Sequence, residues 1–252
     1  MWMFSSAISA IFFFSSRGRN TKSYSVTVVQ ACALPISRSY DIEAGIWDSV
    51  VGQATGYGAG GIFGIDIVGT GSTNIVNNSG YIYAGIDWSD VYGGAGGIFG
   101  INLGGCSADE KTVNNTLDAY GYGGSIEAGL FGSDVYDGDV MGIYGVNIDS
   151  AVQINTVNNL GSIYAGVEET TISGYGAYGI YGVRVSDYGV TNTVNNHVLT
   201  DDDGNRIPWS GLIVAAFEDS RATGDVMGLF GVTIGEIEGP WSGPPSDRKS
   251  VV

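Results

Sequence analysis

The chain has 252 residues, 26 of them Asp or Glu and 10 of them Lys or Arg, so its formal net charge is −16 at neutral pH. Such a charge argues against nucleic acid as a partner, because the phosphates would be repelled. Glycine is abundant, with 42 residues, yet aliphatic residues recur between the glycines at fixed intervals. This pattern is typical of a folded repeat and not of a disordered chain.

Both ends of the chain are expected to lie outside the fold. Residues 26–36 read VTVVQACALPI, which agrees at nine of eleven positions with VTGVQTCALPI, the conceptual translation of a sequencing adapter; the closing DRKSVV resembles another such translation. A secretory signal is the rival interpretation of the beginning, but its positive charges follow the apolar run, which is also shorter than the about 20 residues of a membrane span. We predict one domain over 39–239, flanked by 1–38 and by an unstructured tail, 240–252.

Removing the ends makes the composition more acidic. Residues 39–246 hold four Lys or Arg against 25 Asp or Glu, a net charge near −21. One cysteine, Cys106, remains once Cys32 is assigned to the adapter-like segment. An intrachain disulfide, a thiol motif and a cysteine-based zinc cluster are therefore not expected.

Two strand-like motifs alternate along the predicted domain. The motif I-x-A-[GA]-[ILVF] begins at positions 42, 82, 126, 163 and 213, and G-[IL]-[FY]-G begins at positions 61, 97, 142, 179 and 228. A VNN triplet follows at 76, 113, 157 and 194, which gives a repeat of about 37 residues. Extra residues enter only between VNN and the next I-x-A-G, as expected for one loop corner of a stacked solenoid.

The residues around the glycine of each motif predict how the strands stack. The residue before it alternates between small and aromatic: Ala44, Phe63, Ala84, Phe99, Ala128, Tyr144, Ala165, Tyr181, Ala215 and Phe230. The residue after it is always apolar. Strand side chains alternate between faces, so we expect both columns inside, each alanine making room for a ring in the next coil. The glycine would then face outward or lie at a β-bulge.

These patterns predict an all-β fold, a right-handed parallel β-helix (β-solenoid) with about two coils per 37-residue repeat. Ten coils would stand roughly 45 Å tall. An antiparallel sandwich or barrel is the alternative, but the two-residue hairpin turns that it would use are missing from the sequence. The last Asn of each VNN either stacks its amide on its neighbours, adopts a left-handed turn, or simply ends a strand.

Asp201, Asp203 and Asn205 are the candidate metal ligands. They surround Gly204 in the longest insert and supply hard oxygen atoms in a tight turn, which suits calcium. The turn departs from the EF-hand pattern, and a solvated acidic turn is the alternative. No other cofactor is expected.

A second acidic corner places Asp90 and Asp134 at equivalent positions, expected within two coils of each other. A bound cation or screening by water would relieve their repulsion.

Catalysis is not expected. His197, the only histidine, follows a VNN triplet without any nucleophile pattern and is interpreted as a surface loop residue. Arg184 takes a strand position held in other repeats by Asp66 and Asn102, and is expected to face solvent or acidic neighbours. An enzyme of the polysaccharide-degrading type would have to combine Arg184 with Asp66 or Asp87, which the predicted winding separates by many coils.

An aromatic stripe is the candidate binding surface. Tyr83 and Tyr164 are expected to point outward, with Trp47, Trp88 and Phe131 nearby. Exposed aromatic side chains suit carbohydrate or protein ligands. Ordinary decoration of the stack is the alternative.

The succession TVNN-x-G-x-I-x-A-G followed by A-x-GI-[YF]-G resembles the passenger repeats of bacterial autotransporters and related large surface proteins over nearly all of 41–235. The resemblance implies a right-handed β-helix outside the cell, often tethered by a C-terminal outer-membrane barrel. We therefore expect a fragment of an exported, cell-surface passenger solenoid with a non-catalytic display or adhesion role toward glycans or proteins. The alternative is a polysaccharide-degrading β-helix enzyme, a lyase or glycoside hydrolase.

Overall fold

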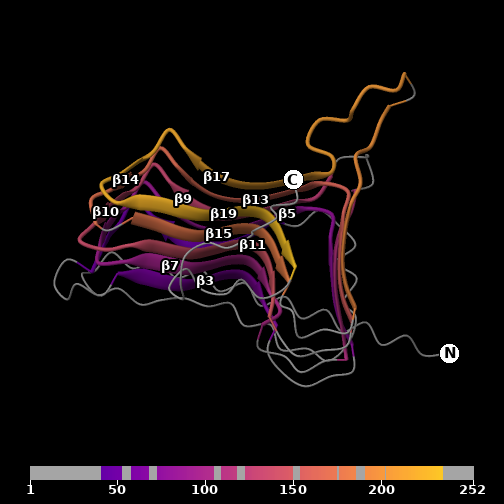
Figure 1. Ribbon diagram of the computed structural model, residues 1–252, viewed down its shortest axis with the longest axis horizontal. Helices are drawn as coiled ribbons and strands as arrows, with labels where there is room; N and C mark the ends of the chain where they lie inside the picture. The colour runs from indigo at the N-terminus through magenta and orange to yellow at the C-terminus, as the bar shows by residue number, and fades with distance from the viewer. Residues whose placement is uncertain are drawn as a thin grey trace, which may run out of the picture.

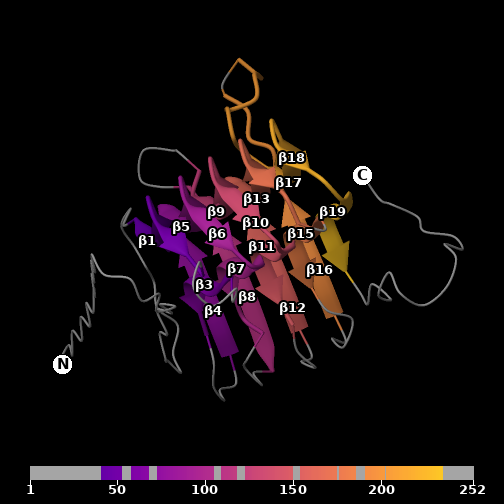
Figure 2. The ribbon, with the colours of Figure 1, turned by 90° about the vertical axis from the view of Figure 1, so that its left-hand side faces the viewer.

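The computed structural model describes residues 41–52, 58–67, 73–104, 109–117, 123–149, 154–174, 176–185, 191–201 and 203–234. Every regular element among them is a β-strand, and the strands form four parallel sheets stacked as a β-solenoid (Figures 1 and 2). The predicted class, an all-β parallel solenoid, is thereby confirmed. The described residues contain no helix long and apolar enough to cross a membrane.

Each turn visits the four sheets in the same order, and we number them I to IV along the chain. Sheet I holds the I-x-A-G motifs and contains β1 (Ile42–Trp47), β5 (Tyr81–Asp87), β9 (Ser125–Phe131), β13 (Ser162–Glu168) and β17 (Leu212–Glu218). Sheet II is narrow and contains β2 (Val50–Val51), β6 (Asp90–Tyr92), β10 (Asp134–Tyr136), β14 (Thr171–Ile172) and β18 (Arg221–Ala222).

The other two sheets carry the remaining motifs. Sheet III holds G-[IL]-[FY]-G and contains β3 (Ala59–Asp66), β7 (Ala95–Asn102), β11 (Val140–Ile148), β15 (Gly176–Val185) and β19 (Asp225–Ile234). Sheet IV holds VNN and contains β4 (Thr73–Asn78), β8 (Glu110–Asn115), β12 (Ile154–Asn159) and β16 (Thr191–Asn196).

The prediction of two coils per 37-residue repeat is wrong. Ala84 pairs with Ala44 and with Ala128, whereas Phe63 pairs with Phe99, so alanine stacks on alanine and aromatic on aromatic. One 37-residue repeat is therefore a single turn of four strands, and the two similar motifs belong to different sheets. Five strands at the usual spacing of about 4.8 Å give a stack of roughly 19 Å, less than half the height expected.

In sheet I the side chains face as predicted, and in sheet III they do not. Ala84 and Ile86 are fully buried in the core of sheet I. In sheet III, Phe99 is half-exposed on the outer face, while Gly100 points inward. The glycine with an unusual backbone is also a different one, because the first glycine of each sheet III motif, such as Gly97, has the positive φ (63°).

The inward glycines of sheet III divide the interior. A methyl group on Gly100 would lie 2.6 Å from the Cγ2 atom of Ile126, across the core on sheet I. On one side of this contact, Ala84, Val91 and Ile98 belong to a core shared by sheets I, II and III. On the other side, Ile82, Ile101 and Val113 join sheets I, III and IV. Glycine therefore permits a close approach of two sheets at the waist of each turn.

Two asparagine ladders run along sheet IV, and the outer one passes through Asn77, Asn114, Asn158 and Asn195. In the inner ladder, the side-chain amide of each VNN-terminal Asn donates to the next at 2.8 Å, through Asn78, Asn115, Asn159 and Asn196. Asn115 also donates to the backbone oxygen of Gly124 at 2.9 Å, which ties sheet IV to the start of sheet I. The predicted amide stacking is confirmed, and each of these residues also ends its strand.

A column of aromatic rings covers the outer face of sheet III. Neighbouring rings are nearly parallel, with centroids 4.8 to 5.3 Å apart, in the order Phe63, Phe99, Tyr144, Tyr181 and Phe230. Such stacking stabilises the in-register pairing of identical positions.

The predicted domain, 39–239, contains all the described residues. The expectations for 1–38 and 240–252 lie outside the part of the chain that the structure describes.

Candidate ligand groove on sheet I

A shallow groove of about 350 Å³, open to solvent, lies on the outer face of sheet I near its N-terminal strands. Five aromatic and three acidic residues line it: Trp47, Tyr81, Tyr83, Trp88, Phe131, Glu43, Asp87 and Glu127. Its volume is at the lower end of the range typical of small-molecule sites.

The strand register assembles the groove from three turns. Glu43, Tyr83 and Glu127 form one outward row across β1, β5 and β9, and Trp47, Asp87 and Phe131 form another. Residues that are about 40 positions apart in the sequence thereby become neighbours at the strand spacing.

Outward glycines of sheet I lie between these two rows and leave room for the aromatic rings. A methyl group on Gly85 would lie 2.0 Å from the hydroxyl oxygen of Tyr83, and one on Gly129 would lie 3.0 Å from the Phe131 ring. The rings therefore lie down over the glycines and cover the sheet. This arrangement gives sheet I an aromatic floor of inclined rings, with centroids 5.8 Å apart between Tyr83 and Phe131 and 6.4 Å apart between Trp47 and Tyr83.

Trp88 projects from the corner between sheets I and II. Its backbone is left-handed, with φ 48°, and its side chain is 64% exposed. The next residue anchors the corner: the Ser89 N–H donates to the Ser133 hydroxyl at 3.1 Å, and the Ser89 hydroxyl donates to the backbone oxygen of Asp87 at 2.7 Å. These bonds fix the backbone of the turn that carries the exposed indole.

Hydrogen bonds couple the tyrosines of the groove to its carboxylates. The Tyr81 hydroxyl donates to Glu127 Oε2 at 2.6 Å, and the Tyr83 hydroxyl donates to Asp87. Burial, followed by these hydrogen bonds, raises the pKa of both tyrosines, so they remain neutral donors. Burial also raises the pKa of the Asp87 carboxyl, although hydrogen bonds from Tyr83 and Trp47 oppose that shift.

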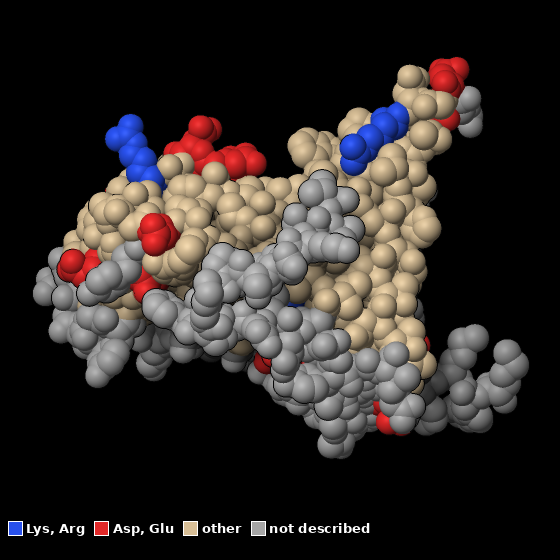
Figure 3. Space-filling model, in the orientation of Figure 1, with Lys and Arg blue, Asp and Glu red and all other residues tan. Residues whose placement is uncertain are grey.

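The groove is acidic, and its lining holds no positively charged residue that would balance the three carboxylates. None of its lining residues is Lys or Arg. Of the basic side chains that the structure describes, Lys111 is buried in sheet IV, Arg184 lies on sheet III, Arg206 lies in the projecting insert and Arg221 lies in sheet II. Figure 3 shows further acidic side chains gathered near β17, at the other end of the stack.

The predicted calcium ligands lie in the insert between β16 and β17, which projects from the solenoid (Figures 1 and 2). Asp201 already accepts hydrogen bonds within its own turn: Oδ1 from the N–H groups of Asp203 and Asn205 at 3.0 and 2.8 Å, and Oδ2 from the Asn205 amide at 3.2 Å. These bonds lower the pKa of Asp201. Within the described residues, no three or more His, Cys, Asp or Glu side chains form a metal-binding group. Calcium therefore stays a prediction.

The other residues singled out from the sequence are separate from the groove. Asp90 and Asp134 are direct partners on adjacent strands of sheet II, within the two coils expected, and Tyr136 donates to Asp134 Oδ2 at 3.3 Å. His197 is exposed at the start of the insert, in accord with its interpretation as a loop residue.

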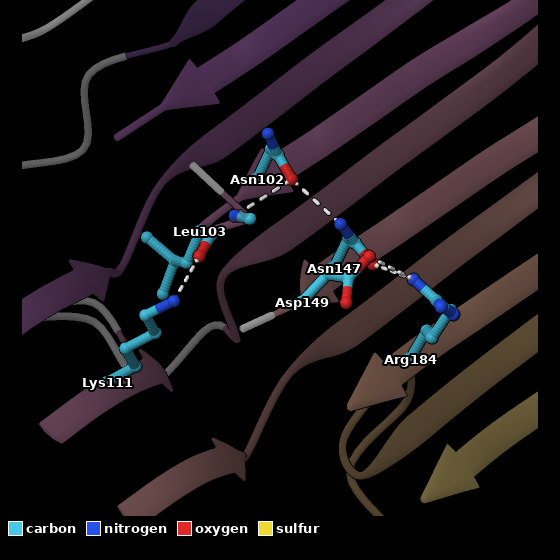
Figure 4. A network of polar contacts seen from close by, with 7 residues as sticks. Asn102, Leu103, Lys111, Asn147, Asp149 and Arg184 are labelled. Carbon is cyan, nitrogen blue, oxygen red and sulfur yellow. Dashed lines mark hydrogen bonds and ion pairs between the residues drawn. The ribbon is translucent and has the colours of Figure 1, made fainter. Parts of the chain in front are cut away.

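Arg184 is paired as predicted. Its Nη1 donates to Asn147 Oδ1 and forms an ion pair with Asp149 Oδ2, both at 3.1 Å (Figure 4). The column continues through Asn102 to Asp66, three strands away from Arg184. Asp87, the other acid considered with Arg184, lies on a different sheet.

Lys111 is a polar feature that the sequence analysis missed. It is fully buried, and its Nζ donates to the backbone oxygen of Leu103 at 2.6 Å (Figure 4). Neighbouring turns have Asn74 and Asn155 at the same position. A lysine in a column of asparagines was the available signal, because a buried ammonium group has to find hydrogen-bond acceptors within the fold.

The fold and the groove define a repetitive β-solenoid with a decorated outer sheet. No protein-family model, curated protein or solved structure matches the chain.

Proposed function

We propose that the chain is the solenoid of an exported bacterial surface protein, and that it acts in display or adhesion, without catalysis. The aromatic and acidic groove on sheet I carries this proposal. It is a shallow groove on a sheet of five parallel strands in register, and a preformed surface of this kind loses less entropy on binding than a mobile one.

The export and surface location are supported by the repeat motifs. The succession of TVNN, I-x-A-G and GI-[YF]-G resembles autotransporter passengers, and cysteine is scarce. An outer-membrane tether on the native protein would present sheet I to external glycans or proteins. The four sheets supply the rigidity that display requires.

A binding assay with a turnover control tests the proposal. The full chain is immobilised and exposed to panels of glycans, including acidic polysaccharides, and of surface proteins, while the solutions are assayed for reducing and unsaturated sugar ends. We expect binding without released ends, and weaker binding by Trp88→Ala. Trp209→Ala is the matched control, because Trp209 is also exposed (72%) with a positive φ (66°) but lies in the insert.

Two results would overturn the proposal. Released sugar ends would favour the polysaccharide-degrading alternative, and binding to no member of either panel would remove the adhesion role.

A further inference from the structure

We propose that the groove on sheet I binds the cationic side chain of a basic protein segment, an arginine guanidinium or a lysine ammonium. This inference rests on the proposed binding function and names the ligand class for the same groove.

The charges of the groove select a cation. Glu43, Asp87 and Glu127 contribute three carboxylates within one groove that has no Lys or Arg in its lining. Glu127 and Asp87 accept hydrogen bonds from tyrosines, but Glu43 is exposed and accepts none from the residues that the structure describes. Besides burial, charge repulsion from Glu43 raises the pKa of Asp87, and a positive group bound among the three carboxylates would relieve this repulsion.

The aromatic floor selects an organic cation over a metal ion. Trp47, Tyr83 and Phe131 form a continuous series of rings, and Trp88 stands at its edge. An ammonium or guanidinium group gains cation–π attraction over such rings, most strongly over tryptophan. Guanidinium also stacks flat on aromatic faces and forms paired hydrogen bonds with carboxylates, which makes arginine the better of the two ligands.

The shape of the groove favours a side chain presented by a larger partner. At about 350 Å³ and open to solvent, the groove accommodates one long side chain and not a folded element. The same outer face carries Glu168 and Glu218 at its far end, where burial and the nearby Glu218, Glu169 and Asp219 raise the pKa of Glu168. A basic segment lying along sheet I therefore meets carboxylates beyond the groove as well.

Calorimetric titration of the full chain with two peptides tests the inference. Tetra-arginine is compared with tetra-citrulline, which keeps the shape of the side chain and removes its charge. We expect the arginine peptide to bind at least tenfold more tightly, and its affinity to fall as salt is added. Tetra-lysine is expected to bind with an intermediate affinity.

Matched variants assign the binding to the groove. Glu43→Gln and Trp88→Ala should each weaken tetra-arginine binding at least fivefold. Asp203→Asn and Trp209→Ala make the same chemical changes at exposed positions of the insert and should leave the affinity unchanged. Thermal melts of all four proteins check that the fold is retained.

The possible failures are distinct. Equal binding of arginine and citrulline peptides, or equal losses in groove and control variants, would overturn the inference. So would no binding of tetra-arginine by a chain that binds neutral glycans or proteins, although the proposed adhesion role would then stand. No binding of peptides, glycans or proteins would overturn both.

Discussion

Sheets I and III carry nearly the same short motif, yet the central glycine of the motif lies on the outer face in sheet I and faces the core in sheet III. In sheet I, Gly85 faces outward beneath the Tyr83 ring, whereas in sheet III, Gly100 faces inward against Ile126. The outward glycines make room for aromatic side chains, and the inward glycines bring two sheets together. A repeated glycine is thus evidence for a close approach, but not for which face is approached.

The largest effect is expected when the inward glycine of sheet III is filled. In Gly100→Ala, the added methyl would lie 2.6 Å from Ile126 Cγ2 and 2.7 Å from the backbone oxygen of Gly145. Neither atom can move away freely, so we expect the free energy of unfolding to fall by about 3 kcal/mol, as for an overpacked core. Chemical denaturation measures the change.

The control for this variant is Gly231→Ala, in the same column of the last strand. Its methyl would meet only the backbone oxygen of Ile213, at an ordinary 3.6 Å. A similar loss of stability in both variants would contradict the assignment of the cost to the contact between sheets.

A smaller effect is expected when the outward glycine of sheet I is filled. In Gly85→Ala, the three nearest atoms all belong to the Tyr83 ring, which can swing toward solvent. We expect a loss of about 1 kcal/mol, the usual worth of one hydrogen bond, here that from Tyr83 to Asp87. Ultraviolet titration should show the raised pKa of Tyr83 falling toward its ordinary value.

Sheet I itself supplies the control, because Ala216 already occupies this column in β17. Ala216→Gly should leave the tyrosine titration unchanged. A larger stability loss in Gly85→Ala than in Gly100→Ala would reverse the comparison between the sheets.

The smallest change in stability is expected from mild acidification, and the carboxyl groups responsible for it lie on sheet I. Burial raises the pKa values of Asp87 and Glu168 in the folded state, so the folded protein binds their protons more tightly than the unfolded chain does. Their ionisation is unfavourable to folding at neutral pH, and that cost disappears as the pH falls through the raised pKa values. Thermal melts from pH 7.5 to about 5 should therefore show a slight rise in stability. The range stops above the lowered pKa of Asp201, whose stabilising contribution is lost only under more acidic conditions.

Asp87→Asn separates the contribution of sheet I, since this variant should rise less over the same range. A steady fall of stability between pH 7.5 and 5 in the parent chain would contradict the assignment.

The sequence was sufficient to predict a parallel β-solenoid, because the repeat and the apolar columns require stacked strands. It was not sufficient to predict the winding, because the likeness of the motifs around Gly64 and Gly85 fits either adjacent coils or separate sheets. Only the register decides, with Phe63 beside Phe99 and Ala84 beside Ala44.

The candidate groove was predicted in part for the same reason. Its aromatic members stand out by type, and Trp47, Trp88 and Phe131 were recognised with Tyr83. Glu127 was not, because it reaches Tyr83 only through pairing of β5 with β9. Acidic partners in a repeat protein depend on the register, which short motifs do not fix.

One turn for each 37-residue repeat has a consequence for reach. Adding a whole repeat extends the axis by a single strand spacing, so a rod about 100 Å long would take about 21 turns, or roughly 770 residues. Lengthening the solenoid therefore takes many residues for each ångström. A single turn, in contrast, already has four sheets, each with its own outer face. For a solenoid of this kind, changing the side chains on the outer face of one sheet alters the surface with far fewer residues than adding turns does.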